Sequence, residues 1–318
     1  MVSGIFACHL SNTTVMNKHI LFLLISCISM TLKAQDDLLD ELNKIQKPVA
    51  NYASATFKSS RIVSGHSIET VAAKHLDFRI SHRFGALNSG YQELFGLDQS
   101  QIRLGFEFGL TDRLTVGVGR NSYQKTYDYY AKYKLLRQSS GAKVMPVTVA
   151  LLAAAYTNTM PSQPNARFFN NLERQTYCGQ LLIARKFGER VSLQLTPSIL
   201  HRNKVETEND ANTLYSLGMG GRFKLTRRTS FNVEYYYTPT SAGEISLRDP
   251  QFKNALSVGF DIETGGHVFQ LHFTNSKGMT EKYLIGQTEG MWQNGDIFYG
   301  FNVSRVFSFD KTAKQTHK

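Results

Sequence analysis

Apolar and polar residues alternate along the chain from about residue 76 to residue 309, in short segments separated by turn-forming residues. In residues 101–109 the apolar side chains occupy the even positions, as Ile102, Leu104, Phe106 and Phe108. After a turn at 110–113, the same two-residue period resumes in 114–119. Because successive side chains of a β-strand point to opposite faces, this period predicts strands with one apolar and one polar face.

The number and spacing of these segments predict a barrel of about twelve antiparallel strands. We place the strands at 75–84, 101–109, 114–123, 126–136, 147–157, 174–187, 191–200, 214–225, 230–238, 255–263, 267–276 and 296–309. Short turns on one rim and long polar loops on the other are typical of outer-membrane barrels, and an even strand number puts both ends on the short-turn, periplasmic rim. We therefore predict an all-β fold, a transmembrane up-and-down β-barrel over residues 75–309.

The first 34 residues have the features of a secretory signal peptide. Lys18 precedes an apolar run at 20–30, and a small residue, Ala34, stands before Gln35, where we predict cleavage. Translation from Met16 would retain these features. A lipoprotein cleavage box at 24–27 is a minor alternative. Because no apolar run approaches the ~20 residues of a membrane helix, we predict an exported chain that enters the bacterial outer membrane through its strands.

Residues 35–74 lie between the signal peptide and the barrel, and we assign them to a periplasmic N-terminal segment. Residues 35–47 predict a short amphipathic helix that Pro48 ends. Residues 49–74 are polar and mixed, and they are compatible with a periplasmic lead-in, a strand or a plug inside the lumen. Residues 310–318 form a C-terminal tail.

Charge and cysteine content limit the chemistry of the chain. The net charge is +11, and removal of residues 1–34 leaves about +9. The basic residues are scattered singly, which favours a lumen lining and contact with anionic lipid headgroups over nucleic-acid binding. Cys178 is the only cysteine left after cleavage, so neither an internal disulfide nor a cysteine metal site can form. We expect no metal and no cofactor.

The polar faces of the predicted strands define a candidate lumen lining of mixed charge. Its ionisable positions are Asp77, Arg79, Arg83, Arg103, Glu107, Arg222, Lys224, Glu234, Asp261, Glu263 and His272, and its neutral polar positions include Gln270 and Thr274. One interpretation is a conduit whose local charge selects solutes. The other is a closed network of ion pairs that fills a barrel of intermediate width. We favour the closed network or a narrow pore over an open channel.

His272 and Thr274 share one face of the strand at 267–276, with the spacing of base and hydroxyl nucleophile in an outer-membrane lipid hydrolase. However, a threonine replaces the expected serine, and the pair faces the lumen rather than the lipid. A histidine in such a position more often only forms a hydrogen bond, so we expect no enzyme. A further set of possible ligands lacks the spacing of a metal motif: His66, His75, Asp77 and His82.

Tyrosines gather near the ends of predicted strands. One group comprises Tyr127, Tyr129, Tyr130 and Tyr133, and another occupies 235–237. Aromatic side chains at strand ends form the interfacial girdles of membrane barrels, so we assign both groups to such girdles.

Several stretches of the chain resemble the domain of unknown function 5777 family of predicted outer-membrane β-barrels. The matching strings lie at 55–59, 65–69, 76–85, 93–98, 111–120, 133–137 and 263–276. The resemblance covers most of residues 55–309, and it implies a fold and a compartment but no assigned activity.

From these observations we expect an outer-membrane barrel that is a narrow pore or a binding barrel for small hydrophilic solutes, with the lumen arginines favouring anions. A non-conducting structural or receptor barrel that acts through its long loops is the alternative, and a lipid hydrolase built on His272 and Thr274 is the second. The expected partners are outer-membrane lipids, the barrel-insertion machinery and the solutes, and not nucleic acid.

Overall fold

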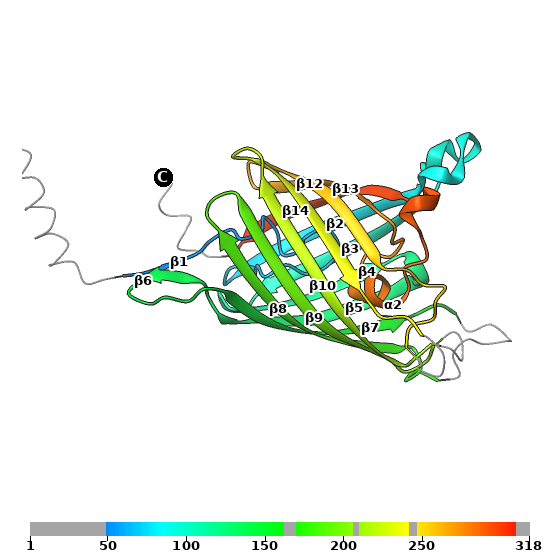
Figure 1. Ribbon diagram of the computed structural model, residues 1–318, viewed down its shortest axis with the longest axis horizontal. Helices are drawn as coiled ribbons and strands as arrows, with labels where there is room; N and C mark the ends of the chain where they lie inside the picture. Colours follow the sequence, from blue (N-terminus) through cyan, green and yellow to red (C-terminus); the bar gives the residue numbers. More distant parts are fainter. Residues whose placement is uncertain (1–48, 162–169, 206–209, 242–246, 310–318) are drawn as a thin grey trace, which may run out of the picture. The chain divides into compact units, whose positions relative to one another are not determined.

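The computed structural model describes residues 49–161, 170–205, 210–241 and 247–309 (Figure 1). The chain divides into two compact units, Met1–Val49 and Ala50–Lys318, and the second contains the fold. The predicted signal peptide at 1–34 with its cleavage between Ala34 and Gln35, the helix at 35–47 and the tail at 310–318 lie outside the described residues. Among the residues described, none of the helices has the length and apolar character needed to cross a membrane.

Twelve strands of the described chain form one closed antiparallel barrel. They are β2 (His75–Ala86), β3 (Ser100–Gly109), β4 (Leu114–Asn121), β5 (Thr126–Leu136), β7 (Thr148–Asn158), β8 (Gln175–Phe187), β9 (Val191–Arg202), β10 (Thr213–Lys224), β11 (Thr229–Tyr237), β12 (Ala255–Thr264), β13 (His267–Thr274) and β14 (Phe298–Ser308). Each pairs with the next in sequence, and β14 pairs with β2, with Val303 opposite Ile80, to close the ring. The prediction of a twelve-strand up-and-down barrel is confirmed. Closure leaves no unpaired edge, which is what a β-structure in lipid requires.

The strand boundaries differ from the predicted ones by up to two residues, with local causes. Strand β13 ends at Thr274 and not at residue 276, because the side chain of Asn275 bonds to backbone atoms outside the β13 ladder, accepting from Leu256 N of β12 and donating to Asn254 O and Gly290 O of the neighbouring loops. The connection between β5 and β7 contains a further strand that was not predicted. This strand, β6 (Ser139–Gly141), pairs with β1 (Ala50–Tyr52) at the short-turn rim.

Two segments enter the barrel from opposite rims. Residues 53–74, which precede β2, fold inward from the short-turn rim, which is the periplasmic rim by the usual rule for such barrels. The long connection between β13 and β14 carries α2 (Glu281–Gly286), whose six residues are all buried and which contacts β8, β9, β10 and β11 from within the ring (Figure 1). The short helices η1 (Leu87–Ser89), η2 (Tyr91–Gly96), η3 (Tyr123–Lys125) and η4 (Trp292–Asn294) lie in the connections of the long-loop rim.

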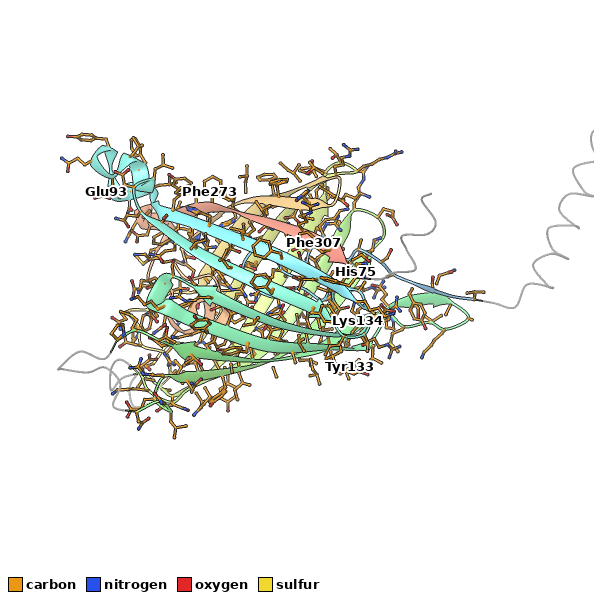
Figure 2. All side chains as sticks on the ribbon, turned by 180° about the vertical axis from the view of Figure 1, so that it is seen from behind. His75, Glu93, Tyr133, Lys134, Phe273 and Phe307 are labelled. Atoms are coloured by element: carbon orange, nitrogen blue, oxygen red, sulfur yellow. The ribbon has the colours of Figure 1, made fainter. Side chains whose placement is uncertain are left out.

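The interior of the barrel has an apolar side and a polar side. Inward-facing residues of β7 and β8, with Leu200 of β9 and Leu214 of β10, form one buried apolar cluster with residues of the two inserted segments, among them Ile62, Ile68, Leu284 and Ile285. The rest of the inward face of β9 and the inward faces of the other strands are mostly polar and charged. Large apolar side chains cover the outside, including Tyr133 and Phe307 near the short-turn rim and Phe273 near the long-loop rim (Figure 2).

Two tyrosines assigned to the girdles lie inside the barrel instead. Tyr130 and Tyr236 are buried, whereas Tyr129 and Tyr237 are exposed on the outer surface. The assignment was wrong because neighbouring residues of a strand point to opposite faces, so a run of tyrosines cannot lie on one surface.

Candidate functional site

The inserted residues 60–67 form a tight hairpin at the centre of the lumen, which we call the plug hairpin. Ser67 N donates to Ser60 O at 2.9 Å, and Ile62 N donates to Gly65 O at 2.9 Å, so the chain reverses at Val63 and Ser64. All eight residues are buried. A hairpin this short cannot pair all its own backbone groups, so the barrel wall must supply partners for the rest.

Amide side chains of three wall strands donate to the carbonyl groups of the plug hairpin. Gln270 Nε2 on β13 donates to Ile62 O at 2.6 Å, and Asn302 Nδ2 on β14 donates to Val63 O at 3.0 Å. Gln194 Nε2 on β9 donates to His66 O at 2.8 Å. The hairpin is therefore held from opposite sides of the barrel.

Charged wall residues bond to the remaining backbone groups. Lys132 Nζ on β5 donates to the carbonyls of both hairpin ends, Ser60 O at 3.2 Å and Ser67 O at 3.0 Å. The Glu234 carboxylate on β11 accepts three backbone N–H bonds from the turn, at 2.9–3.1 Å, from Val63, Ser64 and Gly65. Consecutive N–H groups that converge on one carboxylate resemble the anion-binding nests of other turns.

The hairpin also fits the wall sterically at two glycines. A Cβ atom on Gly65 would lie 2.1 Å from the Tyr236 hydroxyl oxygen, and one on Gly220 of β10 would lie 2.2 Å from Ile62 Cδ1. Gly220 thus leaves the space that the Ile62 side chain fills, which is a common reason for glycine within a strand.

The two inserted segments meet at the carboxylate of Glu281, the first residue of α2. Arg61 Nη1 donates to Oε1 at 3.1 Å, and the backbone N–H of His66 donates to the same oxygen at 3.2 Å. Tyr156 on β7 donates its hydroxyl proton to Oε2 at 2.8 Å. We call the long connection between β13 and β14 (275–297) the inserted loop. Glu281 therefore connects the inserted loop to the plug hairpin and to the wall.

Further ion pairs surround this junction on the polar side of the lumen. Arg103 on β3 and Asp128 on β5 form a bidentate pair, with Nε–Oδ1 at 3.0 Å and Nη2–Oδ2 at 2.5 Å. Arg61 Nε lies 3.9 Å from Glu107 Oε1. Buried charges persist only when they are paired in this way, since an uncompensated charge in such a place is strongly destabilising.

All eleven ionisable positions assigned to the lumen lie on inward-facing positions of their strands. Nine of them are buried: Asp77, Arg79, Arg83, Arg103, Glu107, Arg222, Glu234, Asp261 and His272. Lys224 and Glu263 are half-buried near the short-turn rim, where Glu263 pairs with Lys58 of the inserted segment. The nine buried side chains contact the plug segment, one another or other lumen residues such as Asp128 and Gln270, which is the arrangement of a filled interior.

The sequence interpretation missed the inward face of β5, and it left residues 49–74 open between a periplasmic lead-in, a strand and a plug inside the lumen. Asp128 and Lys132 occupy alternate positions of β5, so the two-residue period would have placed them in the lumen. Residues 60–67 show no regular alternation of apolar and polar residues, so only their contacts identify the hairpin as a plug.

His272 and Thr274 are both buried in the lumen, and each has another partner. His272 Nε2 accepts from Arg83 Nη2 at 3.2 Å, while Thr274 Oγ1 lies 2.9 Å from Ser257 Oγ. His272 Nε2 is therefore bonded to a guanidinium group. Both side chains face the lumen and not the lipid-facing surface, with exposures of 1% and 0%.

The described residues contain no group of three or more histidine, cysteine, aspartate or glutamate side chains that could hold a metal ion. The earlier candidates are dispersed. His66 lies in the plug hairpin, and Asp77 Oδ2 lies 3.5 Å from Arg79 Nη2. The ring of His82 faces outward and stacks on the ring of Phe301, with the centroids 5.2 Å apart.

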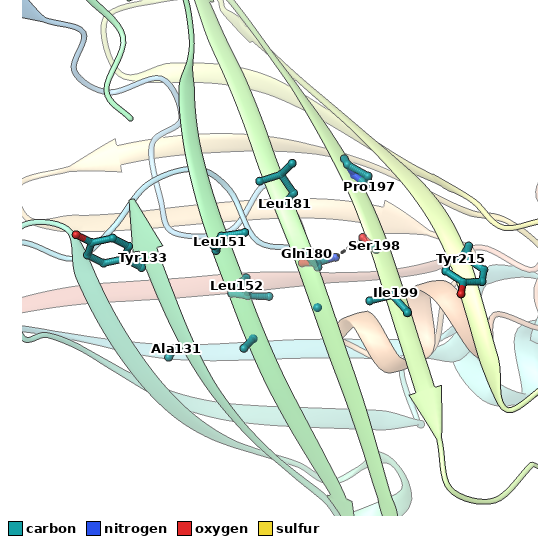
Figure 3. A pocket seen from close by; sticks show the side chains of 12 residues that line it. Ala131, Tyr133, Leu151, Leu152, Gln180, Leu181, Pro197, Ser198, Ile199 and Tyr215 are labelled. Carbon is teal, nitrogen blue, oxygen red and sulfur yellow. Dashed lines mark hydrogen bonds between the residues drawn. The ribbon is translucent and has the colours of Figure 1, made fainter. Parts of the chain in front are cut away.

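A hollow of about 760 Å³ lies on the outer surface of β5 to β10 (Figure 3). Ala131, Ala153 and Gly179 are paired neighbours across β5, β7 and β8, and their small side chains contribute to it. Tyr133 and Tyr215 stand at its two sides (Figure 3). This surface faces the lipid, and we assign no specific ligand to it.

The sequence over residues 57–307 matches the membrane bound beta barrel domain family DUF5777. The chain belongs to this family. The family and the closed barrel together make the protein an outer-membrane β-barrel, in contact with membrane lipid on its outer face. No curated protein matches the chain in sequence.

Solved structures with a similar arrangement of strands include outer-membrane porins and channels. The NanC porin is 10% identical, with a TM-score of 0.45, over 74% of this chain and 99% of its own. The KdgM porin is 9% identical, with a TM-score of 0.43, over 74% and 99%. An outer membrane channel from Pseudomonas putida F1 is 13% identical, with a TM-score of 0.46, over 76% and 98%. Likeness at this level carries no argument about activity, and the fold rests on the strand pairing described above.

Proposed function

We propose that this DUF5777 barrel is a gated passage for small hydrophilic solutes, and that residues 53–74 and the inserted loop close it in the conformation described. The observation that carries the proposal is the junction at Glu281, where the plug hairpin and α2 meet across the lumen through Arg61. The two segments are held by polar contacts and have no covalent link at this point. Such contacts can be exchanged for contacts with a solute or with water.

The path of the plug segment supports a removable closure. Residues 53–74 enter and leave by the same rim, because Ala53 N bonds to Gln138 O and Lys74 N bonds to Gly109 O. The hairpin can therefore withdraw toward the periplasm without being threaded through the barrel. A pocket of about 230 Å³ already lies at this rim between the segment and the wall, lined in part by Glu69 and Lys134.

Withdrawal would expose a polar passage. The wall residues that now hold the hairpin include Lys132, Gln194 and Gln270, and the arginines of the polar side lie beside them. Charged rings select solutes by sign in pores, so the arginines would favour small anions over small cations.

The experiment is a single-channel recording in planar bilayers on the wild-type chain, Gly65→Val and Thr70→Val. The Gly65→Val side chain cannot fit beside Tyr236, so we expect its open probability to rise by about tenfold, the effect of a ~1.4 kcal/mol shift in a two-state equilibrium. Thr70→Val introduces the same side chain at a partly exposed position of the same segment, where it removes only an exposed hydrogen bond to Asp112 O, and it should stay close to wild type. Absence of conductance in every correctly inserted variant would overturn the proposal and favour the non-conducting receptor barrel.

A further inference from the structure

The polar contacts between the barrel wall and the plug hairpin are directed mainly to its main chain. The wall donors to its carbonyl groups are Lys132, Gln194, Gln270 and Asn302, and the wall acceptor for its N–H groups is Glu234. Glu281 of the inserted loop accepts one more, from His66 N. The lumen thus holds part of its own chain in the way that a receptor holds a bound peptide, in which main-chain hydrogen bonds give affinity.

A second set of wall contacts depends on the hairpin side chains. Arg79 Nη2 donates to Ser60 Oγ at 3.2 Å, and Arg83 Nη2 donates to Ser64 Oγ at 2.9 Å. The ring centroids of His66 and Tyr130 lie 4.3 Å apart, Arg61 Nε lies 3.9 Å from Glu107 Oε1, and Ile62 fills the space above Gly220. The carbonyl and N–H contacts of the turn would be the same for other side chains. Because main-chain groups are common to all peptides, this part of the wall is complementary to a peptide backbone and does not require one sequence.

Displacement of the hairpin leaves these wall groups without partners, and a solute that replaces it must satisfy them. Buried donors and acceptors that lose their partners are destabilising. An inorganic anion such as chloride or sulfate accepts hydrogen bonds but carries no donor for Glu234 and Glu281. A peptide offers carbonyl acceptors and N–H donors at the spacing that the wall already matches.

We propose that the solutes of this barrel are short peptides, which bind the polar side of the lumen through their main chain in place of the plug hairpin. This inference rests on the proposed gated passage and names its solute class. The same wall residues bind peptide main chain in both states. They bind the plug hairpin when the barrel is closed and a free peptide when it is open.

The test uses the full-length Gly65→Val chain in planar bilayers with N-acetyl-tetra-alanine amide, which is a peptide backbone with minimal side chains. Sucrose, which has nearly the same mass, is the control solute. We expect the peptide to block the current in a concentration-dependent way and sucrose to have no such effect. Equal effects of peptide and sucrose in a chain that conducts would overturn the peptide inference and leave the gated passage intact.

A second variant tests whether the wall amides are responsible. Adding Gln270→Leu and Asn302→Leu to the Gly65→Val chain removes two carbonyl donors, and we expect block by the peptide to weaken by about fivefold or more. Gln180→Leu is the matched control, because Gln180 is a buried lumen glutamine that donates to Ser198 of β9 and not to the hairpin. An equal loss of block in both would contradict a role for the two amides.

Binding measured without conduction separates this inference from the proposed function. A fluorescent synthetic peptide of residues 57–70 is titrated with the full-length Gly65→Val chain in detergent, and anisotropy reports saturable binding. Binding by a chain that never conducts would retain the peptide site and remove the passage. Absence of binding, with the barrel folded, would overturn the peptide site whether or not the chain conducts.

Discussion

Arg61 and Glu281 are 220 positions apart in the sequence, yet their side chains lie 3.1 Å from each other inside the barrel. Both side chains are almost fully buried, at 3% and 1% exposure. The pair joins two segments that enter from opposite rims, so it reports directly on whether the lumen is closed. Removing one member leaves the other charge buried, which is the costly way to break such a pair.

Glu281→Gln should lower the free energy of unfolding by about 3 kcal/mol, the lower end of the range for breaking a buried ion pair. The lower end applies because Glu107 remains 3.9 Å from Arg61. The measurement is urea unfolding in lipid vesicles. The control is Glu189→Gln, which removes a surface contact between Lys186 and a glutamate that is 81% exposed, and it should cost less than about 1 kcal/mol. Equal costs for the two substitutions would contradict a buried junction at Glu281.

Gly220 and Ile62 should show energetic coupling, because the glycine leaves the space that the isoleucine fills. We expect Gly220→Ala alone to lower the free energy of unfolding by about 1–3 kcal/mol through crowding, and Ile62→Ala alone to lower it by about 2–5 kcal/mol. The double variant should be more stable than the sum of the single effects predicts, by about 1 kcal/mol, since each change relieves the other.

The control for this pair is Gly179→Ala on the lipid-facing surface. Its added Cβ would meet only the Ile199 side chain, at 3.2 Å, and no part of the plug segment. Gly179→Ala should therefore add independently to Ile62→Ala. Strict additivity of Gly220→Ala with Ile62→Ala would place Ile62 elsewhere in the folded protein.

The barrel was predictable from the sequence because one physical rule generates it. Alternation of side-chain direction fixes the outward apolar face, as at Phe106, and the inward polar face, as at Arg103, and closure follows from the need to pair every edge in lipid. The same rule identifies which side chains face inward, but it contains no information about what they contact. For that reason it could not decide between a watery lumen and a filled one.

The sequence allowed a lumen plug at residues 49–74 as one of three alternatives, but it could not select the plug, because the stability of the plug comes from contacts between distant parts of the chain. Residues 60–67 show no period, and the three N–H groups bound by Glu234 belong to a turn whose position depends on the whole barrel. The sequence of β7 did contain one indication of a filled interior. Leu151 and Leu152 are adjacent apolar residues of β7, and a strand that is apolar on both faces indicates that its inner face packs against protein and not against water.

Cys178 should act as a native reporter of opening. Its side chain faces the lumen within the buried apolar cluster, and it is 4% exposed. We expect a water-soluble thiol reagent to leave Cys178 unmodified in the folded wild-type chain and to modify it in Gly65→Val, in which the hairpin is displaced. The rate of labelling is measured by mass spectrometry. Thr70→Val is the control, and rapid labelling of this variant or of wild type would show that the described conformation does not exclude water from the lumen.

The closed state should weaken as the pH falls, through His66 of the plug hairpin. Burial lowers the pKa of His66 well below its ordinary value of 6.5, and the positive charges of Arg61 and Lys132 act in the same direction. Glu281, whose Oε1 is 3.8 Å from His66 Nε2, is the acidic group that faces it. Because the released or unfolded hairpin binds a proton that the closed form does not, the stability of the closed form is present above pH 6.5 and is lost as the pH falls below it.

The loss of closed-state stability through His66 has an upper limit of about 1.4 kcal/mol per pH unit. It is measured as open probability in planar bilayers, and as the free energy of unfolding, between pH 7.5 and pH 5. His66→Gln removes the contribution of His66 and should reduce the pH dependence in this window. His201→Gln, at an exposed histidine of β9 that contacts Thr213, should leave the slope of wild type unchanged. An unchanged slope in His66→Gln would show that another group controls the response, because the neutral amide cannot gain the charge that opposes Arg61.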